Sequence, residues 1–112
     1  MTRLVLLFIT SIMVLMSTPI MAAGDPVAGQ EKSAPCQACH GPDGNSTDPQ
    51  FPRLAGQYAN YLVRALEEYQ TGIRKNPIMA GFAATLTAQD RQDLAAFYSG
   101  QPNGLYVIGH GP

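Results

Sequence analysis

Charge is scarce in this 112-residue chain: 13% of the residues are Asp, Glu, Lys or Arg, and the net charge is −1. No run of residues is rich in Lys or Arg, so nucleic acid is not expected as a partner. Low charge combined with 46% hydrophobic residues also argues against a disordered chain. The length allows one small domain, which excludes two-domain enzymes and large barrels.

One long apolar run is present, from Leu4 to Met16, and it follows Arg3 near the N-terminus. This run is shorter than the roughly 20 apolar residues that cross a bilayer, and small residues follow it at Ala22 and Ala23. The pattern predicts a signal peptide over residues 1–23, with an uncleaved anchor as the alternative. We therefore expect a domain over residues 24–112, with a short tail from residue 103, that is periplasmic and not stably inserted in the membrane.

Alternation of polar and apolar residues, the mark of a strand, is absent beyond residue 24, and three segments have helical patterns instead. The first begins at Asp25, with Pro26 at the first helical position, and runs toward Ala34. Pro35 is expected to kink or end this helix, because proline lacks the N–H that the helical ladder needs.

The second predicted helix covers about residues 57–71 and ends at Gly72. Its apolar side consists of Tyr58, Tyr61, Leu62, Ala65, Leu66 and Tyr69. The third begins at Thr87, with Asp90 as its capping-box partner, and ends at Gly100. Its buried side is expected to contain Leu94, Ala95, Phe97 and Tyr98.

Residues 41–56 and 74–81 are rich in Gly, Pro, Asn and Asp and are predicted to be loops. Three short helices and two long loops make a poor core, and domains this small usually need a metal, disulfides or another staple. The sequence therefore predicts a small all-α fold, with about three main helices and loops wrapped around a large apolar cofactor.

Cysteine and histidine are rare, with two of each in the chain, and three of these four residues fall together in Cys36-Gln37-Ala38-Cys39-His40. C-x-x-C-H is the attachment signature of c-type haem. Two thiols at this spacing can add to the two vinyl groups on one porphyrin edge, and the adjacent His40 can bind the iron. A thioredoxin-like redox pair, a zinc site and a plain disulfide are the alternatives; the first lacks a preceding strand and the second lacks ligands.

Methionine is equally scarce beyond the signal segment, where Met79 is the only one. His/Met ligation is used by electron-transfer cytochromes c and raises the reduction potential. Met79, in the predicted loop, is therefore the preferred sixth ligand of the iron. His110, in the glycine-rich tail, and an iron with an open sixth site are the alternatives.

Several further segments accompany the C-x-x-C-H motif: Gly29 lies seven residues before Cys36, and Phe51–Gln57 (FPRLAGQ), Met79 and Leu94–Gln101 (LAAFYSGQ) follow. Together these segments resemble the class I c-type cytochromes, of the monohaem c553 and c5 type and similar to one domain of cytochrome c4. The resemblance covers residues 24–102, nearly the whole predicted domain, and it implies one covalently bound haem c.

The resemblance also implies roles for individual residues. The carbonyl of Pro52 would accept a hydrogen bond from Nδ1–H of His40, which fixes the tautomer of the imidazole. Arg53 and Gln57 would contact a haem propionate. Gly29 would lie where the first and last helices cross, and the partners expected there are Leu94 and Phe97. Tyr58 and Tyr61 are expected in the core or the haem wall.

By this resemblance the chain is a single-electron carrier and not an enzyme. It would pass electrons at an exposed haem edge to redox partner proteins that dock transiently. One alternative is a haem subunit of a periplasmic dehydrogenase or oxidase complex, in which the apolar tail Leu105–Ile108 forms an interface. Another is a gas-binding or peroxide-reactive haem protein, which requires that Met79 is not a stable ligand.

Overall fold

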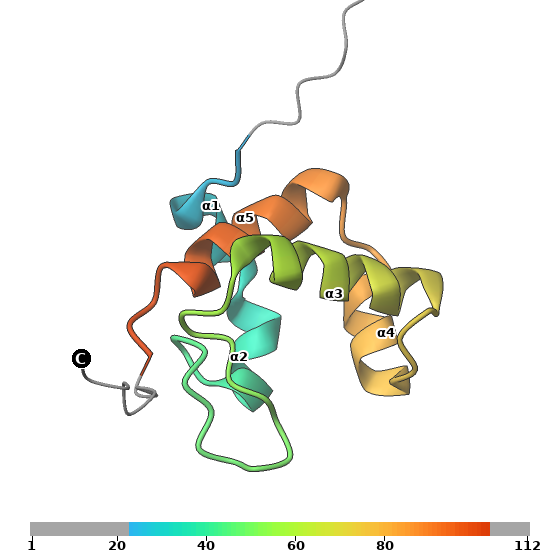
Figure 1. Ribbon diagram of the computed structural model, residues 1–112, viewed down its shortest axis with the longest axis horizontal. Helices are drawn as coiled ribbons and strands as arrows, with labels where there is room; N and C mark the ends of the chain where they lie inside the picture. Colours follow the sequence, from blue (N-terminus) through green and yellow to red (C-terminus); the bar gives the residue numbers. More distant parts are fainter. Residues whose placement is uncertain (1–22, 104–112) are drawn as a thin grey trace, which may run out of the picture.

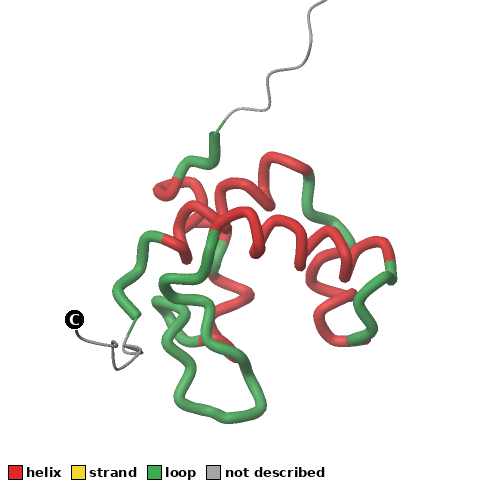
Figure 2. Tube along the Cα trace, viewed as in Figure 1, coloured by secondary structure: helices red, strands yellow, loops and turns green. Residues whose placement is uncertain are grey.

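The structure is a computed structural model that describes residues 23–103. It contains the helices α1 (Pro26–Lys32), α2 (Ala34–His40), α3 (Ala59–Thr71), α4 (Pro77–Ala83) and α5 (Ala88–Ser99). Figure 1 shows α1 beside α5, α3 lying across α5, and α2 and α4 extending from the same side of α3. The segment from α2 to α3 is a long loop (Figure 2). The described residues contain no strand, so the all-α prediction is confirmed.

Two of the predicted features lie almost wholly outside the described residues: the signal peptide, of which only Ala23 is described, and the tail with His110, of which only Asn103 is described. Within residues 23–103, no helix has both the length and the apolar character needed to cross a membrane.

The first predicted helix corresponds to α1, and a second helix that the sequence analysis did not predict, α2, follows it from Ala34. α1 ends at Lys32, and the buried Ser33 turns the chain, with its Oγ donating a hydrogen bond to Gln30 O at 2.7 Å. Pro35 lies in the first turn of α2, where a backbone N–H has no partner within the helix. The first helix therefore ends close to Pro35, as predicted, but Pro35 is not what ends it, because Pro35 stands at the beginning of the helix that carries both cysteines.

The second predicted loop is also partly helical. Asn76 caps α4, with Oδ1 accepting from the backbone N–H groups of Ile78 (3.0 Å) and Met79 (3.1 Å), and Pro77 occupies the first turn. A cap residue followed by proline is the same start signal that Asp25 and Pro26 give to α1. The prediction of a loop through Met79 is wrong, since Met79 lies in the first turn of a helix.

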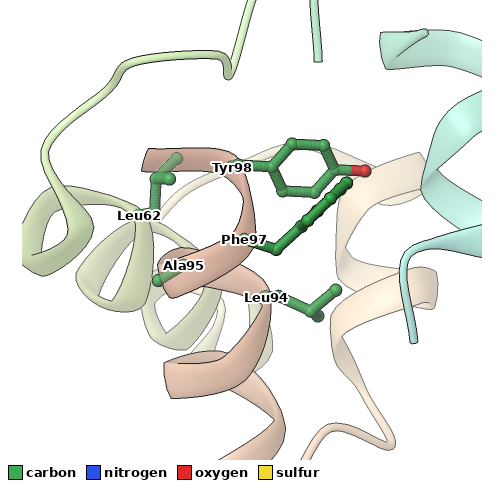
Figure 3. Close-up of a cluster of buried hydrophobic side chains, with 5 residues drawn as sticks. All are labelled: Leu62, Leu94, Ala95, Phe97 and Tyr98. Carbon is green, nitrogen blue, oxygen red and sulfur yellow. The ribbon is translucent and has the colours of Figure 1, made fainter. Parts of the chain in front are cut away.

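The last helix agrees with its prediction. Thr87 Oγ1 accepts from Asp90 N–H at 3.1 Å, and Thr87 N–H donates to Asp90 Oδ2 at 2.8 Å, so the capping box is complete. α5 supplies four of the five members of the buried apolar cluster, and α3 supplies the fifth, Leu62 (Figure 3). The members of this cluster are Leu62, Leu94, Ala95, Phe97 and Tyr98.

α1 crosses α5 at Gly29, which is buried. A Cβ at this position would lie 2.0 Å from Asp93 O and 2.8 Å from the Cβ of Phe97, so only glycine allows the two backbones to approach this closely. Phe97 is thus confirmed as a neighbour of Gly29. The nearest atom belongs to Asp93, one residue before the expected Leu94.

The same crossing contains a buried charge. The carboxylate of Asp93, whose exposure is 2%, accepts hydrogen bonds from Asp25 N–H (2.9 Å), Gln89 Nε2 (2.8 Å) and the ammonium of Lys32. Lys32 also pairs with Asp90 at 2.8 Å. The hydrogen bonds from Lys32 lower the pKa of both Asp93 and Asp90 to about 2. Burial of a carboxylate is tolerated here because every contact stabilises its charged form.

Substitution Gly29→Ala is expected to lower the free energy of unfolding by about 3 kcal/mol, because the new methyl group overlaps a backbone carbonyl that cannot move alone. Chemical denaturation of the purified protein measures this loss. Gly81→Ala is the matched control, since nothing lies within 4 Å of a Cβ built there and its φ is not positive. A Gly29→Ala variant as stable as the Gly81→Ala variant would contradict the close crossing.

Substitution Asp93→Asn is expected to destabilise the protein at neutral pH and to make its free energy of unfolding depend less on pH in the acid range. A carboxyl whose pKa falls from 3.8 to about 2 on folding stabilises the protein above about pH 4, and this contribution is lost as the pH falls toward 2. The difference in stability between wild type and Asp93→Asn should therefore shrink over that interval. The exposed Glu31 of α1 provides the control Glu31→Gln, and an equal pH dependence in both variants would contradict the assignment.

Candidate haem site

A cavity of about 380 Å³ lies among α2, the loop that follows it, α3, α4 and α5. One wall is apolar and comes from α3 and α5; it comprises Leu62, Ala65, Leu66, Leu94, Ala95 and Tyr98. All the residues predicted to hold the cofactor also line this cavity, although they come from three separate segments. They are Cys36, Cys39, His40, Pro52, Arg53, Gln57 and Met79.

The two cysteines lie three residues apart in α2, so a single turn of helix brings both thiols to the cavity. Both are half-buried free thiols, and burial raises the pKa of Cys36. α2 then ends at His40, and Gly41 turns the chain away with φ 84°, a left-handed conformation that favours glycine. The turn leaves the buried imidazole of His40 facing the same cavity as the thiols.

The imidazole of His40 is held from the loop after α2. Its Nδ1 lies 2.8 Å from Pro52 O, and the ring of Phe51 packs edge-on with the centroids 6.4 Å apart. Because a carbonyl oxygen can only accept, Nδ1 carries the proton and Nε2 keeps its lone pair. This arrangement leaves His40 able to donate a lone pair from Nε2 to a metal ion.

Met79 reaches the cavity from α4, on a different element from His40, and its side chain is half-buried. A thioether is a soft ligand that suits haem iron beside an imidazole. Within residues 23–103, no group of three or more His, Cys, Asp and Glu side chains is arranged to bind a metal ion directly.

Arg53 and Gln57 lie on the loop between α2 and α3. Arg53 is exposed, and Gln57 is half-buried with Oε1 accepting from Tyr58 N–H at 2.9 Å. Tyr61 lines the cavity as expected, whereas Tyr58 does not. Tyr58 is 79% exposed because it stands just before α3 begins, so its prediction as a core or wall residue is wrong.

Sequence reasoning did not predict Arg74 at the cavity. Its guanidinium lies over the rings of Tyr61 and Tyr69, and all three residues line the cavity. Hydrogen bonds, first to Tyr61, raise the pKa of Arg74. The spacing of eight residues between the two tyrosines indicated a shared helix face, but only the turn at Gly72 brings Arg74 back to that face.

The shape and chemistry of the cavity fit a flat, largely apolar cofactor that carries one metal ion. The thiol pair lies on α2, an imidazole and a thioether come from separate elements, and apolar side chains form the wall. The wall also contains one polar atom, the hydroxyl of Tyr98, which is buried without a hydrogen-bond partner among the described residues. The fold and the site thus define the class of small helical domains built around a covalently attached haem.

Comparison with known proteins identifies the family within this class. The family model for cytochrome c matches residues 26–99. Cytochrome c4 of Pseudomonas aeruginosa is 48% identical over 80 residues, which is 71% of this chain and 40% of that protein. Cytochrome c-554(548) of Halomonas halodenitrificans is 43% identical over 82 residues, which is 70% of this chain and 99% of that protein.

The crystal structure of reduced recombinant cytochrome c4 from Pseudomonas stutzeri is similar with a TM-score of 0.70 and 43% identity, over 74% of this chain and 48% of that one. The chain belongs to the cytochrome c family, whose members contain covalently bound haem c. It spans 40% and 42% of the length of the cytochromes c4 of Pseudomonas aeruginosa and Azotobacter vinelandii, and almost the full length of cytochrome c-554(548).

Proposed function

We propose that this chain is a periplasmic single-electron carrier and not an enzyme. One haem c is attached through Cys36 and Cys39, and its iron is ligated by His40 and Met79. The observation that carries the proposal is that all four side chains line a single cavity, with the imidazole supplied by α2 and the thioether by α4. When bound, haem c supplies a one-electron couple between Fe(II) and Fe(III).

Two features of the cavity suit a haem that changes its oxidation state by one electron. Pro52 O holds the ring of His40 in one orientation, so Nε2 needs no rearrangement when the oxidation state changes. The apolar wall would give a bound haem a less polar surrounding, which favours the oxidation state of lower net charge. With the imidazole of His40 and the thioether of Met79 both bound to the iron, no open position would remain for a substrate.

Arg53 and Gln57 are proposed contacts of a haem propionate. Both line the cavity, and both come from the exposed loop between α2 and α3, where a charged propionate can remain near water. Of the two side chains, only the guanidinium of Arg53 carries a full positive charge, which makes it the stronger partner for a carboxylate.

Transient docking of redox partner proteins is proposed at the exposed haem edge. Support comes from a relative in Stutzerimonas stutzeri, 38% identical over 68 residues, whose name describes it as the electron acceptor of thiosulfate dehydrogenase. Export to the periplasm is supported by the pattern of residues 1–23, in which Arg3 precedes an apolar run and small residues follow.

Substitution Met79→Ala is expected to leave the haem covalently bound but to open the sixth position of the iron. The reduced variant should bind carbon monoxide, and the oxidised variant should lose the weak far-red band of Met–Fe(III) coordination. Optical spectra with and without the gas measure both effects. Ile78→Ala, at the exposed neighbouring position of α4, is the control and should stay closed. A Met79→Ala variant that excludes the gas would show that another group is the ligand.

Combined substitution of Cys36→Ala and Cys39→Ala is expected to abolish covalent attachment and with it most of the folded protein. Seven apolar residues are buried among those described, and four of them belong to α5, so little remains to hold the other helices. Denaturing electrophoresis with haem staining measures the attachment, and circular dichroism measures the helix content. Each single substitution keeps one thioether and serves as the control. Recovery of a stable haem-free fold would contradict the proposed dependence on the cofactor.

A further inference from the structure

The helix that carries Met79 buries little of its own surface. Among the seven residues of α4, only Ala83 is buried, while Ile78 and Phe82 are 62% and 46% exposed. Burial of apolar area by α4 is therefore small, and it stabilises the position of this helix only weakly. Side chains of α3 instead form polar contacts with the segment just before α4 and with the segment just after it.

Arg74 lies at the near end, between Gly72 and the cap residue Asn76. Gly72 ends α3 in a left-handed conformation (φ 76°), which turns the chain back along the helix. Arg74 N–H then donates to Glu68 O at 3.0 Å, and Arg74 Nε lies 3.3 Å from Glu68 Oε2. Two residues farther on, the side chain of Asn76 accepts from the backbone N–H of Met79.

The guanidinium of Arg74 has additional contacts with two aromatic rings of α3. Its Cζ lies 5.6 Å from the ring centroid of Tyr61 and 5.4 Å from that of Tyr69, and both terminal nitrogens lie 3.4 Å from Tyr61 Oη. Three α3 side chains therefore hold one arginine of the connecting segment. A planar guanidinium can combine these contacts, whereas an ammonium cannot form the same fork.

Gln70 acts at the far end. Its Nε2 donates to Leu86 O at 2.9 Å and lies 3.3 Å from Ala84 O. Gln70 therefore binds two backbone carbonyls in the segment just after α4. Arg91 of α5 fixes Gln70 in turn, with Nη1 donating to Gln70 Oε1 at 2.7 Å. Both ends of α4 are thus attached to side chains of α3.

We propose that Arg74 and Gln70 are positioning residues that anchor the two ends of α4 to α3 and so hold Met79 at the cavity. The inference rests on the proposed ligation of iron by Met79 and extends it to residues that need not touch the iron. Neither anchor belongs to the buried cluster of Figure 3, so its loss should release α4 while that cluster stays folded.

The test compares Arg74→Met with Arg64→Met in the haem-containing protein. Arg64 also pairs with Glu68, at 3.0 Å, but it is 71% exposed and lies within α3, away from the connection to α4. In Arg74→Met, amide exchange over α4 should be at least about tenfold faster than in wild type, because charged hydrogen bonds and cation–π contacts each change an equilibrium several-fold. Arg64→Met should remain within about twofold.

Optical spectra of the same variants measure the consequence for the iron. The far-red Met–Fe(III) band should be lost at a lower pH in Arg74→Met than in Arg64→Met, and the reduced Arg74→Met variant should bind carbon monoxide more readily. Arg74→Lys, which keeps the charge but not the planar fork, should fall between Arg74→Met and wild type. Gln70→Ala should also speed amide exchange over α4 and lower the pH at which the far-red band is lost, because it releases the C-terminal end of α4.

Equal exchange over α4 in Arg74→Met and Arg64→Met would overturn the inference. A changed reduction potential without faster exchange would also overturn it, since Arg74 would then act on the cofactor directly. A wild-type protein that lacks the far-red band contradicts the proposed ligation by Met79 and not the anchoring, which the exchange rates decide independently of the iron.

Discussion

At the crossing of α1 and α5, the backbone of Gly29 lies against the carbonyl of Asp93, while the carboxylate of Asp93 binds Lys32 and the N–H of Asp25. This contact fixes the two ends of the described domain against each other. Only the buried Ser33 separates the end of α1 from the beginning of α2, so the direction of the helix that carries both cysteines follows from the crossing. A side chain at Gly29 would separate the helices and move the thiols with respect to the apolar wall that α5 provides.

The two sides of the cavity are held by different kinds of interaction. On one side, His40 is buried at the end of α2 and its imidazole is bonded to Pro52 O, while Cys36 of the same helix packs against the apolar cluster. On the other side, Met79 belongs to a seven-residue helix with one buried residue. Apolar burial resists displacement through many small contacts, whereas a few hydrogen bonds can be lost together. The Met79 side is therefore the one at which the site can open without loss of the core.

The sequence predicted those parts of the fold that depend on local rules. The capping box at Thr87 follows from hydrogen-bonding needs that a short motif expresses, whereas the helix crossing at Gly29 was implied by the resemblance to class I c-type cytochromes. A proline in the first helical turn marks the start of α1, and the same signal stands at Pro35 and Pro77, at the starts of α2 and α4. Seven-residue helices give too few apolar positions for a periodic pattern, so the proline in the first turn is the feature of the sequence that indicates them.

Other features of the site depend on tertiary contacts that no local motif encodes. The residues around the cavity come from segments far apart in the chain, and the C-x-x-C-H motif identifies the chemistry without showing which helix supplies the opposite wall. Arg74 illustrates this limit, because its contacts with Tyr61 and Tyr69 exist only after Gly72 reverses the chain. A domain built around a cofactor can be inferred from its attachment motif and its small predicted core, since both can be recognised from the residue types alone. The support behind each proposed ligand is a property of the folded chain. His40 is buried and bonded to Pro52 O, whereas Met79 lies on a helix with one buried residue.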